Sequence, residues 1–174
     1  DYSAPERFSK QIAYLLENPG TDVLGTDAHL INNTGKIWGE LGYKKDPTMK
    51  DWVIRSQMIH PTIMMKASVL KEAQGYNSKA IRVEDYELWF RLLVKNVCFQ
   101  NLKEKLYYFH WSDVDYQRKK FRDRLSEAKM RFKGMRLNKV SLWDYRYALK
   151  PLIIALLPDA LLHFIHKIKF RFKT

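Results

Sequence analysis

The sequence predicts an α/β fold followed by a mainly helical, basic C-terminal extension. Three observations support this division. Helix-like and strand-like segments alternate up to residue 112, as they do in α/β domains. Hydrophobic residues make up 46% of the 174-residue chain, which is enough for a packed core. The charge is uneven, because residues 1–89 hold 11 Lys or Arg against 12 Asp or Glu, whereas residues 90–174 hold 20 against 7.

The first expected element is a helix that begins at a capping box formed by Ser3 and Glu6. The Asn18-Pro19-Gly20 sequence is typical of a helix end. Between these signals the apolar residues Phe8, Ile12, Leu15 and Leu16 recur at helical spacing.

The following segments continue the alternation. The composition of residues 32–35 (Asn-Asn-Thr-Gly) is that of a turn, so the flanking apolar segments are expected to form a hairpin. Asp46-Pro47-Thr48 indicates a helix start, and Gly75 indicates a helix end. The expected strands cover residues 22–31, 36–38, 58–65, 97–102 and 106–111, and the expected helices cover 48–57, 66–74 and the segment from Asp85.

A boundary is expected near residue 114, between an α/β unit over 1–114 and a basic amphipathic extension over 115–174. Residues 116–174 hold 16 Lys or Arg against 4 Asp or Glu. The longest apolar stretch, Pro151 to His166, is interrupted by Pro158-Asp159 and is too short to span a bilayer. Cys98 is the single cysteine, which excludes an intrachain disulfide and fits a reducing compartment.

Three kinds of contact are compatible with this extension. Its Lys and Arg suit nucleic-acid phosphates, but residues 116–174 contain no recognised nucleic-acid module and too much apolar surface for a phosphate-binding arm. A basic helix with Phe and Leu on one face suits an anionic membrane. The third alternative is packing on its own domain or a partner. The sequence favours the membrane and no nucleic acid, and hence a cytoplasmic protein peripheral to the inner face of the cell membrane.

The most informative motif runs from His60 to Trp89. It begins with His60-Pro61-Thr62, continues with Gly75-Tyr76 and ends with the segment 83–89 (Val-Glu-Asp-Tyr-Glu-Leu-Trp). This order resembles the acceptor-side half of family 2 glycosyltransferases, which are nucleotide-sugar-dependent enzymes with a Rossmann-like A-type fold. In that family a strand ending in His-Pro-Thr leads to a short helix, a Gly-Gly-Tyr turn and a Glu-Asp-x-x-Leu-Trp helix start. The resemblance covers residues 1 to 112 and implies a partial A-type fold for this chain.

The resemblance extends to the N-terminal segment. Residues 1–11 match a segment of the family that follows its metal-binding Asp-x-Asp signature, so Asp1 stands at the end of that signature or just past it. The strands that hold the nucleotide would then precede this chain. The resemblance therefore implies a bacterial enzyme of surface polysaccharide synthesis that uses Mg²⁺ or Mn²⁺. It also implies a nucleotide-diphosphate-sugar donor, a saccharide or lipid-linked acceptor, and inversion at the transferred sugar.

Asp85 is the predicted catalytic base, because it matches the Asp of the family's Glu-Asp pair. Inverting transfer needs a carboxylate that takes the proton of the acceptor hydroxyl as this oxygen attacks the anomeric carbon. The alternative is that Glu84 and Asp85 are acids that only stabilise a helix N-terminus. Glu84 is the second catalytic candidate, and it either binds acceptor hydroxyls or caps the helix.

Three candidate substrate-binding residues accompany this pair. His60 lies at an expected strand end, where binding side chains are often displayed, although a structural role is the alternative. Trp89 falls in the apolar stripe of its helix, so packing in the core competes with stacking on a sugar. Asp27 follows an apolar run and is either structural or in contact with the acceptor.

His110 is the candidate metal ligand beside Asp1. It follows Tyr107-Tyr108, and this segment resembles a Leu-Tyr-Tyr-Arg-x-His neighbourhood of the family, although the Arg is absent here. The resemblance assigns His110 to the metal or the diphosphate, and an ordinary imidazole is the alternative.

A second class of function stays open from the sequence. The chain is alternatively a non-catalytic module that binds acceptor, membrane or partner and lacks the donor half. A chain that begins at Asp1 is expected to expose a strand edge or an apolar face. It would then either form a homo-oligomer or use its C-terminal helices as cover.

Overall fold

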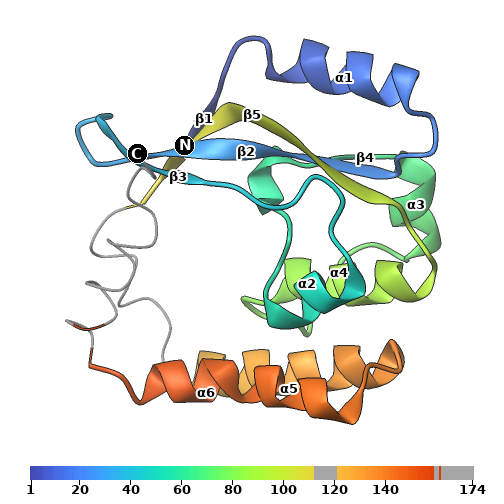
Figure 1. Ribbon diagram of the computed structural model, residues 1–174, viewed down its shortest axis with the longest axis vertical. Coiled ribbons are helices and arrows are strands. Elements are labelled where there is room, and N and C mark those ends of the chain that lie inside the picture. Colours follow the sequence, from blue (N-terminus) through green and yellow to red (C-terminus); the bar gives the residue numbers. More distant parts are fainter. Residues whose placement is uncertain (112–120, 159–160, 162–174) are drawn as a thin grey trace.

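The computed structural model describes residues 1–111, 121–158 and 161. Figure 1 shows one helix on the upper face of a sheet, further helices beneath the sheet, and another helical layer beyond those. The predicted α/β class is confirmed by this arrangement. The expected boundary near residue 114 and the basic tail after Leu161 lie outside the described residues.

The sheet is mixed, and its central pair is parallel. Strand β2 lies between β5 and β3, and β5 lies between β2 and β1. The β2–β5 pair is parallel from Val23 opposite Phe99 to Ile31 opposite His110, whereas β1, β3 and β4 pair antiparallel. The strands are β1 (Tyr2–Ser3), β2 (Val23–Ile31), β3 (Ile37–Leu41), β4 (Met64–Met65) and β5 (Phe99–His110).

The helices lie on both sides of this sheet. In Figure 1, α1 lies above the sheet, α2, α3 and α4 lie below it, and α5 and α6 form the lowest layer. The helices are α1 (Arg7–Glu17), α2 (Met49–Ile54), α3 (Ala67–Glu72), α4 (Glu84–Val94), α5 (Phe121–Leu137) and α6 (Lys150–Ala155), with 3-10 helices η1 (His60–Thr62) and η3 (Leu142–Leu149).

The main hydrophobic core lies between the sheet and helices α2 and α4. Trp52 of α2 and Trp89 of α4 have no exposed surface, and Phe99 of β5 is also buried. The Phe99 ring meets Trp52 at 4.9 Å and Trp89 at 5.8 Å between centroids, both in edge-on geometry. Such aromatic contacts add directional attraction to the burial of apolar area, so they fix α4 on the sheet.

Several local predictions are confirmed. The hairpin turn over residues 32–35 is present, with Asn32 Oδ1 accepting from the backbone N–H of Lys36 at 2.9 Å and Gly35 at a φ of +76°. Thr48 and Asp51 form a capping box at the start of α2. Gly75 follows α3 at a φ of +69°, a conformation that costs glycine little.

The predicted capping box at Ser3 and Glu6 is wrong. Ser3 pairs with Tyr107 in the sheet, and α1 begins only at Arg7. The backbone N–H of Ala4 also donates to the carbonyl of Leu106, which keeps the chain extended past Ser3. Pairing with β5 therefore overrides the local helix-start signal, because it satisfies backbone groups of the same segment.

Two predicted strand boundaries are also wrong. The expected strand over residues 58–65 is interrupted by the 3-10 helix η1, because Pro61 and the hydroxyl of Thr62 favour a turn, and only Met64–Met65 pairs with β2. The two expected strands over 97–102 and 106–111 are one strand, β5. Its pairing register shifts opposite Asp27, so a bulge lies where the sequence suggested a break.

The apolar stripe of α1 faces outwards. Phe8, Ile12 and Leu16 are 55%, 50% and 77% exposed, whereas Arg7 and Gln11 are buried against the sheet. The periodicity predicted the helix, but the buried face is the polar one. The described part of the C-terminal extension lies on the opposite side of the sheet and does not cover this stripe (Figure 1).

Helix α5 packs directly against α4. Gly134 lies so close to the Phe90 ring that a Cβ at this position would come within 2.4 Å of two ring atoms. The Asn138 amide donates to the carbonyl of Phe90 at 3.0 Å. The described part of the extension therefore shares a core with the α/β unit, and its helix α5 reaches the segment that carries Asp85.

We predict that Gly134→Ala destabilises the protein. The buried Phe90 ring has no room to move, so overpacking of about 3 kcal/mol should exceed the helix-propensity gain of about 1 kcal/mol. Urea denaturation should show a net loss of about 2 kcal/mol. Gly20→Ala is the matched control, because a Cβ there meets open space among the described residues. Equal stability of both variants would contradict the close packing of α5 on α4.

Candidate active site

Glu84 and Asp85 occupy the first turn of helix α4. Asp85 is half-buried, and its Oδ1 accepts from the backbone N–H of Tyr86 at 2.7 Å. Glu84 is exposed to solvent. The N-terminal N–H groups of a helix favour a carboxylate in this place and fix its direction. The Asp85 carboxylate is therefore held in one orientation and still faces a cavity.

The start of α4 is fixed from below by Tyr86. This side chain is only 5% exposed, and its hydroxyl donates to the carbonyl of Trp52 in α2. The Arg131 guanidinium of α5 lies 4.9 Å from the centre of the Tyr86 ring. Burial raises the pKa of the Tyr86 hydroxyl strongly, so this group stays protonated and keeps its hydrogen bond. The position of Asp85 thus depends on α2 and α5 together.

Asp85 opens onto a polar cavity of about 150 Å³. The cavity lies where the turn before α4, the end of α2 and helix α5 meet. Hydroxyl, carboxylate and guanidinium groups provide both donors and acceptors around it. Its lining residues are Ser56, Arg82, Val83, Asp85, Tyr86, Glu127 and Arg131.

The candidate substrate-binding residue His60 contacts Tyr76. His60 Nε2 and the Tyr76 hydroxyl are 2.9 Å apart and hydrogen-bonded. Burial raises the pKa of the Tyr76 hydroxyl, and the nearby carboxylates of Asp85 and Glu84 raise it further. The phenol therefore stays neutral near pH 7.

Buried polar contacts hold the turn that carries His60. The Thr62 hydroxyl accepts from the backbone N–H of Thr26 at 3.0 Å, and the Thr62 carbonyl accepts from the Gln11 amide at 2.9 Å. The Asn101 amide donates to the carbonyl of Gln57 at 3.0 Å, three residues before His60. These contacts join the turn to α1, β2 and β5.

The turn that carries Tyr76 is held by Arg91 of α4. Its guanidinium donates to the carbonyls of Ala73 and Gly75, the latter at 2.8 Å, and pairs with Glu87 at 3.0 Å. The same helix therefore presents Asp85 at its start and anchors Tyr76 one turn and a half further along.

Trp89 packs in the core, as one of its two predicted alternatives required. It is fully buried, and its ring lies 6.0 Å from the His60 ring between centroids. A sugar cannot reach Trp89 without opening the core, so a substrate-binding role by direct contact is wrong. The indole instead supports His60 from beneath.

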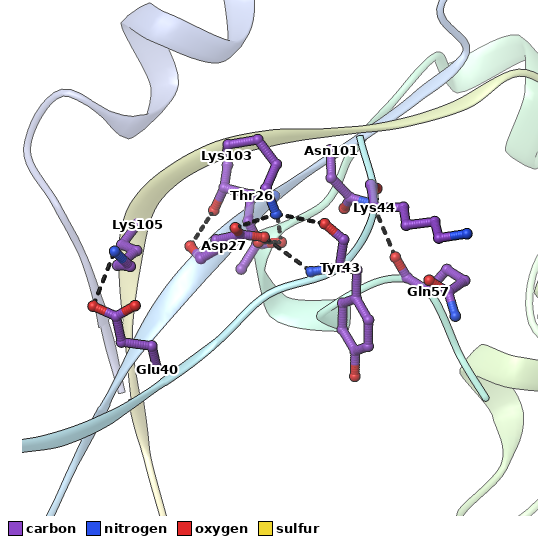
Figure 2. A network of polar contacts seen from close by, with 10 residues as sticks. Thr26, Asp27, Glu40, Tyr43, Lys44, Gln57, Asn101, Lys103 and Lys105 are labelled. Carbon is purple, nitrogen blue, oxygen red and sulfur yellow. Dashed lines mark hydrogen bonds and ion pairs between the residues drawn. The ribbon is translucent and has the colours of Figure 1, made fainter. Parts of the chain in front are cut away.

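Asp27 belongs to a buried polar network beside the site (Figure 2). Its carboxylate pairs with Lys103 at 2.7 Å and accepts from the backbone N–H of Tyr43 at 3.1 Å. Lys103 also donates to the carbonyl of Tyr43 at 2.6 Å. The Asp27 side chain is 8% exposed, and Gly42 leaves space for it, since a Cβ there would lie 2.6 Å from the carboxylate. This geometry gives Asp27 a structural role, which is to fix the segment after β3.

Asp1 and His110 form a separate group at the ends of β1 and β5. Asp1 Oδ1 accepts from the backbone N–H of His110 at 2.6 Å. His110 Nε2 and Asn33 Oδ1 are 2.8 Å apart. The Asp1 carboxylate thus contacts the backbone of His110, whereas the His110 imidazole contacts Asn33. Within residues 1–111, 121–158 and 161, no three His, Cys, Asp or Glu side chains come together as a metal site.

The chain is 31% identical to EpsE of Bacillus subtilis, named as a glycosyltransferase, over 172 residues that cover 96% of this chain and 60% of that protein. It is 36% identical to the O-antigen biosynthesis glycosyltransferase WbnJ of Escherichia coli over 109 residues, 61% of this chain and 42% of WbnJ. It is 30% identical to the uncharacterised glycosyltransferase MJ1057 of Methanocaldococcus jannaschii over 109 residues, 61% of this chain and 37% of MJ1057.

These relatives are glycosyltransferases by name. They support a glycosyltransferase family for this chain. The chain spans between 37% and 60% of the length of these three proteins. No family model matches the chain.

Several residues of this candidate site were not predicted from the sequence. Tyr76 belongs to the Gly75-Tyr76 motif, which by itself indicates no contact for the phenol. Glu127 and Arg131 belong to the basic extension, where the composition shows only their charge. Their spacing of four residues on one helix was the available signal for an ion pair. Nothing in the local sequence indicated that this pair would line a cavity with Asp85.

We predict that Lys103→Met destabilises the protein by about 1–2 kcal/mol, because it leaves the buried Asp27 carboxylate without its charged partner. Thermal denaturation checks this. The matched control is Lys10→Met, which breaks the Lys10–Glu104 pair, whose side chains are 43% and 51% exposed. An exposed pair contributes little, so the control should unfold like the wild type. Equal losses from both substitutions would contradict the structural role of Asp27.

Proposed function

We propose that the protein containing this chain is an inverting glycosyltransferase of family 2 with the A-type fold, and that this chain forms its acceptor side. The observation that carries the proposal is the oriented Asp85 carboxylate beside a polar cavity. Similarity to proteins named glycosyltransferases supports it. The name of WbnJ refers to O-antigen biosynthesis, and we extend that to a role in surface polysaccharide synthesis here.

In the proposed reaction Asp85 acts as general base. Its carboxylate takes the proton of an acceptor hydroxyl, and the hydroxyl oxygen forms a new bond to the anomeric carbon of the donor sugar. The bond from that carbon to the nucleotide diphosphate breaks, and the diphosphate leaves with the electron pair. Attack opposite the leaving group inverts the anomeric centre. Glu84, one residue earlier on α4, contacts further hydroxyl groups of the acceptor.

His60 and Tyr76 position the acceptor in this proposal. Their hydrogen bond joins two turns that come from distant parts of the sequence. We assign this pair to an edge of the acceptor site, outside the cavity that Asp85 lines. The acceptor is a saccharide, either free or linked to a lipid.

Asp1 and His110 contribute to a site for Mg²⁺ or Mn²⁺ in this proposal. Bound there, the cation would neutralise charge on the leaving diphosphate. The two residues supply a carboxylate and an imidazole, and the remaining ligands would come from the donor diphosphate, water or residues outside the described part of the chain.

We predict that Asp85→Asn in the full-length enzyme lowers kcat about 10²- to 10⁴-fold, because it keeps the size of the side chain and removes its basicity. The KM for the donor should change little. Glu84→Gln, at the neighbouring exposed position, should have a much smaller effect on kcat. His110→Ala should instead raise the KM for the donor and for Mn²⁺. Initial-rate measurements with each component varied separately check these outcomes, and near-normal turnover by Asp85→Asn would remove its assignment as the base.

We further propose that the described part of the extension binds the surface of an anionic membrane on the cytoplasmic side. Leu142 and Trp143 are 85% and 81% exposed, next to exposed basic residues on α5 and after it. Exposed tryptophan and leucine beside Lys and Arg suit a membrane interface, where apolar side chains insert and cations meet lipid headgroups. In the described residues no helix is both long and apolar enough to cross a bilayer.

The prediction is that the full-length protein co-sediments with vesicles containing phosphatidylglycerol and that binding weakens as salt rises. The double substitution Leu142→Ser with Trp143→Ser should lower the affinity at least about tenfold, because it removes two side chains that would be buried in the interface. Ile81→Ser with Val94→Ser changes two exposed apolar residues outside both the extension and α1 and should not alter binding. Equal binding to neutral and anionic vesicles, or none to either, would contradict the proposal, and tight binding to nucleic acid would favour the alternative partner.

Self-association through α1 is the last part of the proposal. Three large apolar side chains of this helix are exposed on the side away from the described C-terminal helices. A second copy that packs on this stripe would remove it from water. Size-exclusion chromatography with light scattering of the 174-residue chain should therefore show a homo-oligomer, and Ile12→Ser with Leu16→Ser should shift it to monomer. A wild-type monomer at all concentrations would contradict this expectation.

A further inference from the structure

Helix α5 supplies one wall of the cavity beside Asp85. Glu127 and Arg131 line that wall and are only 8% and 6% exposed. They lie one helical turn apart, and Glu127 Oε1 accepts from Arg131 Nη2 at 3.1 Å. A buried ion pair costs desolvation energy and is a weak source of stability. Because stability alone does not explain this pair, its place beside the predicted base indicates a role in binding.

Arg131 is fixed from several directions. Nη1 lies 3.5 Å and 3.4 Å from the carbonyl oxygens of Val53 and Ile54, at the end of α2. The guanidinium also stacks over the Tyr86 ring. These contacts leave the Glu127–Arg131 pair with a single geometry. A ligand in the cavity would meet a rigid wall of alternating acceptor and donor groups.

A second link from α5 reaches the opposite rim. Asp123 lies on the same face of α5 and pairs with Arg82 at 3.5 Å, in the turn before α4. Arg82 also lines the cavity. Helix α5 therefore contacts both guanidinium groups of the cavity, although its first residue, Phe121, lies 36 residues after Asp85 in the sequence.

The charge of the cavity is balanced. Two carboxylates, Asp85 and Glu127, face two guanidiniums, Arg82 and Arg131, and Ser56 adds a hydroxyl. A phosphate group here would lie close to both carboxylates, and Arg131 already pairs with one of them. Like-charge contacts in a partly buried site are costly. The arrangement suits a neutral ligand with several hydroxyl groups.

The size of the cavity points to a small ligand. Its volume of about 150 Å³ is about half the lower limit for sites that enclose drug-sized molecules. A single sugar ring is in this size range, and the rest of a longer acceptor, or a lipid, would extend through the open side of the cavity.

We propose that this cavity receives the terminal sugar ring of the acceptor, that the ring is uncharged, and that Glu127 and Ser56 determine its specificity. This rests on the proposed function. A lipid carrier, where one is attached, stays outside the cavity. The acceptor hydroxyl that reacts is therefore a sugar hydroxyl next to Asp85, and not an oxygen of a phosphate.

The first experiment measures binding without turnover. Saturation-transfer NMR on the full-length protein would use a panel of neutral methyl glycosides, with glycerol phosphate as the charged probe. At least one glycoside should bind, and Glu127→Gln and Ser56→Ala should weaken it about tenfold and about fivefold, as expected for a charged and a neutral hydrogen bond. Glycerol phosphate should not compete. The matched controls Glu17→Gln, an exposed residue of α1, and Ser126→Ala, an exposed residue of α5, should bind like the wild type.

The second experiment separates this inference from the proposed function. In the transfer reaction, measured well below the melting temperature of each variant, Glu127→Gln and Ser56→Ala should raise the KM for the acceptor by these factors, with the donor KM unchanged. Glu127→Gln should also lower the melting temperature, because it leaves the buried Arg131 without its charged partner. Glycoside binding that neither variant alters, or competition by glycerol phosphate, would overturn the inference even in an active enzyme. If glycosides bind as expected but no nucleotide sugar is turned over, the binding site stands and the proposed function fails.

Discussion

A buried polar contact between Thr62 and β2 connects most of this structure. The Thr62 hydroxyl bonds to the backbone of Thr26, and Gln11 of α1 reaches the carbonyls of both Leu24 and Thr62. These side chains are almost completely buried. In that environment each unmade hydrogen bond costs far more than a made one contributes, so the turn at His60 has one position. The sheet, the helix above it and one edge of the site are therefore fixed together.

On the other side of the sheet a buried guanidinium joins separate elements, as the Thr62 hydroxyl and the Gln11 amide do on the first side. Arg131 joins α5 to the end of α2 and to Tyr86 of α4. Close packing of Gly134 on Phe90 brings the helices near enough for these contacts. Helix α5, which belongs to the basic extension, therefore also has a buried face. That face, and not the charge, determines what α5 adds to the site.

Local signals in the sequence predicted many elements. They failed where the same backbone groups pair with a strand that is distant in the sequence. The turn at residues 32–35 and the cap at Thr48 depend on neighbouring residues, and both are present. Ser3 carried an equally good cap signal, but β5 binds its backbone and the helix starts later. The stripe of α1 predicted a helix correctly and its buried face wrongly. Periodicity shows which residues share a face, whereas the neighbours of that face decide whether it is buried.

The sequence by itself determined the α/β class, the order of most elements and the place of Asp85 at a helix start, because these depend on short-range spacing. The sequence also resembles glycosyltransferases, and the similarity to proteins named glycosyltransferases supports this resemblance. Only the tertiary structure decided which side chains meet. The Tyr76 hydroxyl is hydrogen-bonded to His60, and Trp89 is buried in the core. The Asp27 carboxylate pairs with Lys103 and accepts from the backbone of Tyr43. Glu127 and Arg131 line the cavity next to Asp85. Each of these contacts joins residues from separate elements, whose approach is set by packing and by the need to pair buried polar groups.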